Sequence, residues 1–307
     1  MTIQSPNILP PPGLPKPDFS KIAKEAASRR LDNQWFTIPG QSFTIGFHDP
    51  ENDQGPDRFF AWDNEREPYD VHVPEFQAQA RPVSNGEYAA YLMEAKQLQI
   101  PATWSKTGDY RSQTDFHPFI SRLAVKTVWG PVPLTQALDW PVMASFDEVE
   151  RYANWAGARI PTLHELRSVH NLVERQHHAP DSKVNKEFHT DPRAIFADLS
   201  GTNSGFQNFH PLPITHKDSL CGLGDTGGAA EWTRDFFAPQ PDFKPMDIYP
   251  GYSGELPEMW EKIRQAITDE NHQPTLWMGS IWPLWEGVGL CILALLDERA
   301  CEYPERV

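Results

Sequence analysis

The stretch ASFDEVERYANWAGARIPTLHELRSVHNLV, residues 144–173, contains two helices with clearly marked ends. Ser145 and Thr162 each stand three residues before a glutamate, which is the capping-box spacing of a helix N-terminus. Gly157 separates the two helices and suits the left-handed backbone that ends a helix. We therefore predict one helix on each side of Gly157, over residues 147–155 and 164–173.

Short strands and long loops surround this pair of helices. A third capping box at Ser84 predicts a helix over residues 87–96. Alternating apolar residues predict short strands at residues 36–38, 42–47 and 69–73. Residues 48–57 and 200–254 contain too many turn-forming and polar residues for regular structure. This pattern indicates an α+β fold with short strands, few helices and long ordered loops.

Composition and charge narrow the classes of function. The 307 residues are 39% hydrophobic, enough for a core, and include 30 prolines. The formal net charge of −15 disfavours binding to nucleic-acid phosphates. Three cysteines provide no disulfide framework, and a reducing, cytoplasmic setting is expected. Residues 1–20 do not resemble a secretory signal, and the apolar run at 287–296 is about half of the ~20 residues that a membrane span needs. We expect no membrane association.

Side chains that bind metals or attack substrates show no familiar motif. The 11 histidines include no HExxH pattern, so we expect no self-contained histidine metal site. The acidic loop at residues 49–57 offers oxygen ligands for Ca²⁺ but lacks the EF-hand spacing, and we interpret it as solvated. None of the three cysteines lies in a recognised redox motif.

Two tyrosines are the candidates for acid–base chemistry. Tyr249 and Tyr252 lie in DIYPGYSG, residues 247–254, whose prolines and glycines can shape a loop that aims a side chain at a site. A phenol held close to a reduced oxygen species can donate a proton to it. Packing against the core is the alternative role for both residues. Composition and spacing alone predict a loop-rich α+β domain. They do not indicate a particular reaction.

Several segments resemble the formylglycine-generating-enzyme type, or sulfatase-modifying-factor, domain. They are FFAWDNEREPYDVHVPEF (59–76), ARPVSNGEYAAYL (80–92), residues 124–173, and LGDTGGAAEWTRDFFAPQPDFKPMDIYPGYS (223–253). The phrases VPLTQALDWPVMAS, GARIPT and YPGYS are most similar to one branch, the C-terminal domain of fungal ergothioneine-biosynthesis enzymes. These are iron-dependent sulfoxide synthases that join cysteine to hercynine. The resemblance covers about residues 35–254 and implies a modified C-type-lectin-like fold.

The resemblance also implies a division of the chain into three parts. We expect a proline-rich tail over residues 1–30, with a short helix at 21–31, and the sulfatase-modifying-factor domain over residues 31–254. Relatives continue into an arginine-containing end that holds the sulfur substrate, and here only Gly279-Ser280-Ile281-Trp282 is faintly similar to it. We therefore expect residues 255–307 to be a divergent segment, truncated or altered relative to the family.

The chemistry that the resemblance implies needs a second component. In the relatives, Fe(II) is held by three histidines of a separate helical domain of the DinB type, so the ligands are expected from a DinB-type partner and not from this chain. A tyrosine of the lectin-like domain assists O₂ reduction in the relatives. Tyr249 is the best match for that tyrosine and Tyr252 the second. No cofactor-binding or metal-binding residue is assigned here.

The implied function is the substrate-pocket domain of a non-haem iron sulfoxide synthase. Its substrates would be cysteine, or a cysteine derivative, and the betaine hercynine, with O₂ as the oxidant. Membership of an oxidoreductase family is favoured, while independent catalysis stays open because the active site is incomplete. The alternative is a catalytically inactive lectin-like binding or accessory module. A formylglycine-generating copper oxidase fits poorly, because Cys291 and Cys301 are not the closely spaced pair that those enzymes need.

Overall fold

The computed structural model has the α+β architecture that the sequence predicts. It describes residues 10, 12–46, 68–107, 115–177, 203, 208–216, 220–235 and 243–244. In chain order the elements are α1 (Phe19–Arg29), β1 (Trp35–Ile38), β2 (Gln41–Ile45), β3 (Tyr69–Val73), β4 (Phe76–Gln79), α2 (Asn85–Glu94), β5 (Trp104–Lys106), α3 (Phe116–Ile120), β6 (Leu123–Val125), β7 (Val132–Pro133), the 3₁₀ turn η2 (Leu134–Gln136), α4 (Phe146–Trp155) and α5 (Leu163–His177).

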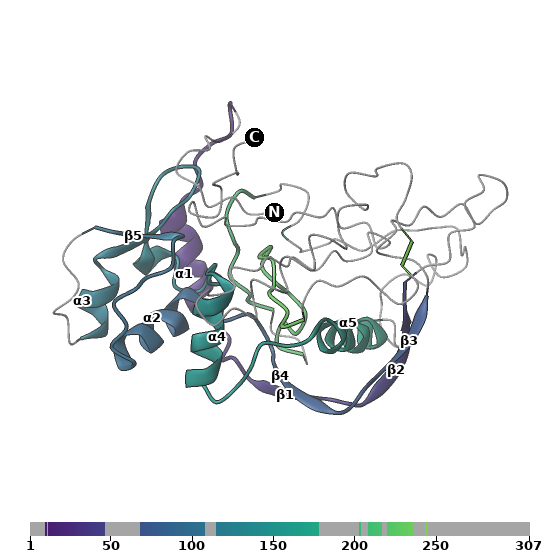
Figure 1. The fold of residues 1–307 in the computed structure, drawn as a ribbon. Coiled ribbons are helices and arrows are strands. Elements are labelled where there is room, and N and C mark those ends of the chain that lie inside the picture. The colour runs from purple at the N-terminus through teal and green to yellow at the C-terminus, as the bar shows by residue number, and fades with distance from the viewer. Residues whose placement is uncertain are drawn as a thin grey trace, which may run out of the picture.

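Two antiparallel strand pairs form a curved ribbon. β1 pairs with β4 and β2 pairs with β3, and Ile38 lies opposite Phe76 in the first pair. Gly40 lies between β1 and β2, where a Cβ would approach the backbone nitrogen of Glu75 to 3.2 Å. Figure 1 shows α5 on the inner side of this ribbon, in contact with β1 and β3. The ribbon therefore gives α5 a fixed support.

A cluster of buried apolar side chains fills the space between the ribbon and α5. Ile38 of β1 and Val169 of α5 meet Leu220 and Leu223, which belong to the irregular stretch 220–235. Because apolar burial contributes roughly 25 cal/mol per Å², the two leucines anchor this stretch although it has no helix or strand of its own. The irregular stretch is thus part of the packed domain.

A second apolar cluster is centred on α2 and Trp140. Tyr88 and Leu92 of α2 are buried, and Trp140 packs with them. The three-stranded sheet β5–β6–β7 adds side chains to this cluster, and all three residues of β6 are buried. Trp104 of β5 donates its indole N–H to the buried Asn85 side chain at 3.2 Å, so its polar atom has a partner inside the core.

The three predicted capping boxes are present. In each box the glutamate carboxylate accepts the backbone N–H of the cap residue, at 2.7 Å for Ser84, 2.9 Å for Ser145 and 2.8 Å for Thr162. The helices begin at the residue directly after the cap, one or two residues earlier than predicted. Gly157 follows α4 with φ +69°, which confirms the predicted left-handed stop.

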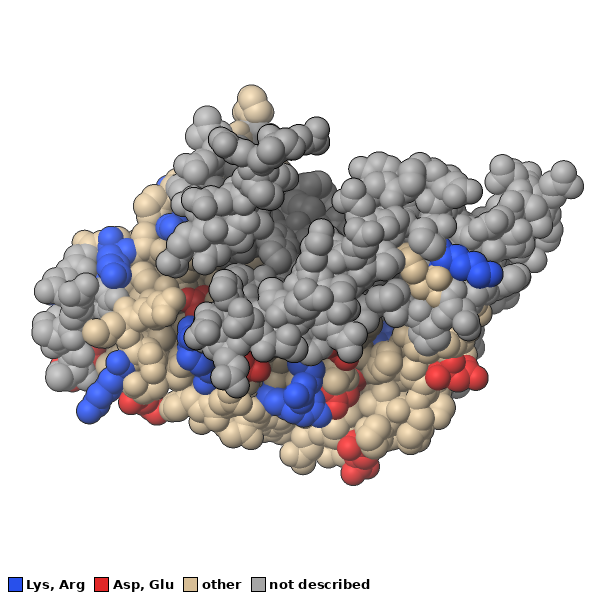
Figure 2. Space-filling view, viewed as in Figure 1, with Lys and Arg blue, Asp and Glu red and all other residues tan. Residues whose placement is uncertain are grey.

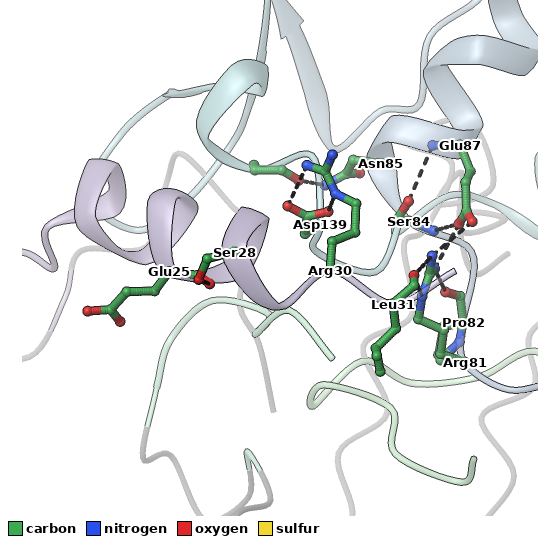
Figure 3. A network of polar contacts seen from close by, with 11 residues as sticks. Glu25, Ser28, Arg30, Leu31, Arg81, Pro82, Ser84, Asn85, Glu87 and Asp139 are labelled. Carbon is green, nitrogen blue, oxygen red and sulfur yellow. Dashed lines mark hydrogen bonds and ion pairs between the residues drawn. The ribbon is translucent and has the colours of Figure 1, made fainter. Parts of the chain in front are cut away.

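Helix α1 is docked on the domain, although the sequence placed it in the proline-rich tail. Phe19 is 4% exposed and packs edge-on against Trp129 and Trp140. At the other end of the helix, Arg30 forms two hydrogen bonds with the Asp139 carboxylate, at 2.5 and 2.9 Å (Figure 3). The short helix expected at residues 21–31 is observed two residues earlier, and it belongs to the folded domain.

A second arginine ties the chain after α1 to the start of α2. Arg81 donates to both carboxylate oxygens of Glu87, at 2.8 and 2.9 Å, and to the carbonyl oxygen of Leu31 (Figure 3). The pocket beside this network has room for about one water molecule, and Arg30, Arg81 and Asp139 on its wall are already paired. We therefore interpret the network as structural: it holds the chain after α1 against the start of α2.

The visible described surface carries mixed charge. Figure 2 shows Lys and Arg side chains interspersed with Asp and Glu, with no large field of one sign among the coloured residues.

None of the helices within the described ranges is long and apolar enough to cross a membrane.

Candidate functional site

The irregular stretch 220–235 contains Glu231, a carboxyl group with a raised pKa, and its turns are fixed by short side chains. Asp225 accepts the N–H of Gly227 at 2.8 Å, and Thr226 accepts the N–H of Gly228 at 3.3 Å. These side-chain to backbone bonds are the mechanism by which Asp and Thr favour turns. Gly227 and Gly228 have φ values of +60° and +83°, a conformation that glycine adopts without steric cost.

A buried asparagine holds these turns against the rest of the domain. The side-chain amide of Asn203 donates to the carbonyl oxygens of His210 and Gly227, at 2.9 and 3.1 Å. Asn203 is 5% exposed, and it leaves so little space that a Cβ at Gly228 would lie 2.6 Å from its Nδ2 atom. Glycine is therefore required at positions 227 and 228 for two reasons. The backbone has a positive φ at both, and a Cβ at either would lie too close to neighbouring atoms.

The tryptophan that follows the glycines, Trp232, has a packing role. Trp232 donates its indole N–H to the carbonyl oxygen of Ala144 at 3.0 Å and packs edge-on against Phe146, the first residue of α4. Thr233 beside it is buried. These contacts fix the chain immediately before Asp235.

Two hydrogen bonds join the end of the stretch 220–235 to the N-terminus of α5. Asp235 accepts the backbone N–H of Leu163 at 2.5 Å, and Arg234 donates its backbone N–H to the carbonyl oxygen of Pro161 at 3.0 Å. A carboxylate is favoured at this position because the first N–H groups of a helix lack partners and carry partial positive charge. We call Tyr69, Leu163, His164, Arg234 and Asp235 the α5 junction.

The α5 junction also holds the start of β3. The Tyr69 hydroxyl lies 3.4 Å from Nε2 of His164, and Tyr69 pairs with Ile45 across the ribbon. Burial raises the pKa of Tyr69, and the negative charge of Asp235 raises it further. The phenol therefore stays protonated at neutral pH and can act as a hydrogen-bond donor toward the imidazole.

Glu231 is the most strongly perturbed carboxyl group of this stretch. Burial raises its pKa to about 7, and the nearby charge of Asp225 adds to the effect. Asp225 itself lies 3.4 Å from Nδ1 of His216. A carboxyl group that titrates near neutral pH can give or take a proton there. Residue order does not reveal such a shift of the pKa, because the shift depends on burial in the folded chain.

Several predicted candidates lie outside the described residues. These are Tyr249 and Tyr252, the acidic loop at residues 49–57, Cys291 and Cys301. The assignment of the two tyrosines therefore stays a prediction. Cys221 is described, and it is half-buried with φ +49°.

The described histidines do not fit an iron site. Three of them have ring nitrogens that face other groups: His72 faces Ser42, His164 faces Tyr69, and His210 faces the carbonyl oxygen of Pro211. Within the described ranges, no group of three or more His, Cys, Asp or Glu side chains is placed to hold a metal ion. We therefore derive no step of a reaction through iron bound to these residues, and the expectation that a partner supplies the ligands stays a prediction.

Comparison with known proteins identifies the family. The sequence profile of the sulfatase-modifying factor enzyme 1-like domain matches residues 20–276. The chain belongs to this family. The match begins within α1, which agrees with the docking of that helix, and it extends beyond residue 254, where the sequence analysis ended the domain.

The chain is also similar to three curated proteins. The chain is 37% identical to Ergothioneine biosynthesis protein 1 of Neurospora crassa, over 83% of this chain and 36% of that protein. It is 29% identical to Ergothioneine biosynthesis protein 1 of Schizosaccharomyces pombe, over 64% of this chain and 22% of that protein. It is 32% identical to Hercynine oxygenase of Mycobacterium tuberculosis, over 62% of this chain and 44% of that protein. The chain therefore spans less than half the length of these relatives.

Proposed function

We propose that this chain is the substrate-pocket domain of a non-haem iron sulfoxide synthase of ergothioneine biosynthesis. The observation that carries the proposal is the 37% identity to Ergothioneine biosynthesis protein 1 across 83% of the chain. The similarity to Hercynine oxygenase supports hercynine as one substrate. The modified C-type-lectin-like fold is part of the same proposal, and the short strands and long packed loops are compatible with it.

The proposed reaction joins a thiol to the imidazole ring of hercynine. Cysteine, or a cysteine derivative, loses its S–H hydrogen and hercynine loses a ring C–H hydrogen, while a carbon–sulfur bond forms. O₂ accepts four electrons in total: one oxygen atom becomes the sulfoxide oxygen and the other leaves as water with both hydrogens. Iron supplies the O₂ chemistry when it is bound, and a DinB-type partner supplies its ligands.

Within this chain, Tyr249 and Tyr252 are the proposed proton donors. A positioned general acid contributes about 10²–10⁴-fold to a rate. We expect Tyr249→Phe to lower kcat by about 10²-fold, with a smaller effect for Tyr252→Phe. Phenylalanine keeps the ring and removes only the hydroxyl, so each variant tests proton donation while the packing of the ring is retained.

The proposal is tested by making the product. The chain is incubated with Fe(II), O₂, cysteine and hercynine, both alone and with the part of the Neurospora crassa relative that lies outside the region of similarity. Mass spectrometry should find the sulfoxide only in the mixture, with one ¹⁸O atom when ¹⁸O₂ is used. No product in either case contradicts the proposal, and binding of hercynine without product favours a non-catalytic module. Product from the chain alone would remove the need for a partner.

A further inference from the structure

We propose that His210 makes the attachment of helix α1 pH-dependent: the neutral ring holds the helix on the domain, and protonation of the ring releases it. The proposal concerns the attachment of α1 and does not rest on the proposed function. His210 lies in the irregular segment 208–216 and is 1% exposed. A buried histidine is notable because its charge ordinarily changes between pH 5 and 8.

Three aromatic rings pack around the imidazole of His210. The ring of Trp140 stacks on it, with ring centroids 5.1 Å apart and an interplanar angle of 24°. Phe19 of α1 packs edge-on at 5.2 Å, and Trp129 packs edge-on at 5.9 Å. Phe19 also contacts both tryptophans. The start of α1 is therefore attached to a cluster of rings that includes the imidazole.

The hydrogen bonding of His210 suits only the neutral ring. Nδ1 lies 2.9 Å from the carbonyl oxygen of Pro211. A carbonyl oxygen can only accept, so Nδ1 carries the hydrogen and the neutral ring has a lone pair on Nε2. Nε2 is buried, and no described group forms a hydrogen bond with it. Protonation would place an N–H group and a positive charge at this atom without an acceptor, which costs more than an unpaired lone pair.

The described groups around His210 do not compensate a positive charge on its ring. The indole N–H of Trp129 is also buried without a described partner, but it can only donate. Burial lowers the pKa of His210, and the hydrogen bond to Pro211 partly opposes this shift. The charged side chains nearest along the chain to the packed rings have other partners, and they are Asp18, Lys126, Asp139 and His216. The other charged side chains of α1 are exposed, and they are Lys21, Lys24, Glu25 and Arg29.

The direction of the pH effect follows from the lowered pKa. The unfolded chain binds a proton at this histidine more tightly than the folded chain does. The stability that neutral His210 contributes is therefore fully present above the ordinary value of 6.5 and is lost as the pH falls below it. Detachment of α1 removes Phe19 from the cluster and opens the imidazole to water, so it is the local opening that allows the ring to bind a proton.

The test compares the full chain with two histidine variants by hydrogen exchange. His210→Phe keeps an aromatic ring in the cluster and removes the titrating nitrogen. His117→Gln is the matched control, because it removes an exposed histidine of α3. Peptides from α1 and from α5 are followed at about pH 7 and about pH 5, where an ordinary histidine changes its charge. The results are expressed as protection factors, which remove the intrinsic pH dependence of exchange.

We expect the protection of α1 to fall by about tenfold at the lower pH in the wild type and in His117→Gln, but by less than about twofold in His210→Phe. The protection of α5 should change by less than about twofold in all three proteins. The proposal is overturned if α1 in the wild type keeps its protection, if α1 and α5 lose protection equally, or if His210→Phe behaves as the wild type does.

A measurement on the wild type alone covers the case in which His210→Phe does not fold. Nuclear magnetic resonance of labelled histidine rings reports the tautomer and the titration of His210, which is recognised by its contact with the Trp140 ring. We expect the neutral Nδ1–H form to persist below pH 6.5. Titration of this ring at or above that value, or an Nε2–H tautomer, contradicts the proposal.

Discussion

At the scale of single residues, Gly228 has two reasons to be glycine: its left-handed backbone and the close approach of Asn203. Its φ of +83° resembles the +91° of Gly130, but a Cβ at Gly228 would lie within 2.8 Å of three atoms of Asn203, while a Cβ at Gly130 would meet nothing within 4 Å. We predict that Gly228→Ala lowers the free energy of unfolding by about 3 kcal/mol and Gly130→Ala by about 1 kcal/mol. Urea unfolding of both variants measures the difference. Equal losses would show that backbone conformation alone matters.

Glu231 gives a residue-scale prediction about pH. Its carboxyl group has a pKa of about 7 in the folded chain, against an ordinary value of 4.5, because burial penalises the charged form. A raised carboxyl pKa means that the folded state binds the proton more tightly than the unfolded state. The contribution of this group is therefore most favourable below pH 4.5 and is lost as the pH rises through 7.

We predict that Glu231→Gln removes this part of the pH dependence. Between pH 5 and pH 8 the wild type should lose up to about 3 kcal/mol of unfolding free energy relative to the variant. Chemical unfolding of both proteins at the two pH values provides the measurement. Glu150→Gln, at an exposed position of α4, controls for the general loss of one negative charge. A wild type and a Glu231→Gln variant with parallel pH profiles would contradict the shifted pKa.

At the scale of elements, α1 tests where the domain begins. Phe19 is buried against Trp129, Trp140 and His210, and its removal would leave a cavity between these rings. We predict that Phe19→Ala lowers the free energy of unfolding by about 3–5 kcal/mol. Lys24→Ala, on the exposed side of the same helix, should change it by less than about 0.5 kcal/mol. If Phe19→Ala has the same Tm as the wild type, this helix does not stabilise the domain and belongs to the tail.

The elements that the sequence predicted well are those whose signals are local. The capping boxes at Ser84, Ser145 and Thr162 involve residues three apart, so residue order alone locates the helix starts to within two positions. Strands β4–β7 carried no comparable signal, because two to four residues form a strand only when a partner is available. The sequence also predicted a helix near α1. It could not show that Phe19 packs against Trp129, Trp140 and His210, which lie more than 100 positions away.

The candidate site was less predictable for the same reason. The α5 junction joins Tyr69, His164 and Asp235, which are far apart in sequence and have no shared motif. The pKa of Glu231 likewise depends on burial that arises only in the folded chain. Tyr249 and Tyr252 came from a family resemblance, and their place in the pocket stays a prediction.

At the scale of the whole molecule, two apolar clusters hold the described elements together. Among the described residues, no group of side chains is placed to bind iron. An iron site needs imidazole and carboxylate ligands that converge on one point. Here His72, His164 and His216 face Ser42, Tyr69 and Asp225 in separate parts of the fold. The net charge of −15 can attract cations through long-range electrostatics, which salt screens.

The proposal that a DinB-type partner supplies the iron ligands predicts the metal content of the purified chain. After anaerobic incubation with Fe(II) and desalting in the presence of a chelator, we expect from this proposal less than about 0.1 iron per chain, because a stably held ion needs several deprotonated ligands at bonding distance. Addition of the remaining part of the Neurospora crassa relative before desalting should raise the value to about one iron per complex, and that part alone is the control for its own binding. Inductively coupled plasma mass spectrometry gives the count. One iron retained by this chain alone would mean that the ligands lie within it, among residues beyond the described ranges, and would contradict the proposal that a partner supplies them.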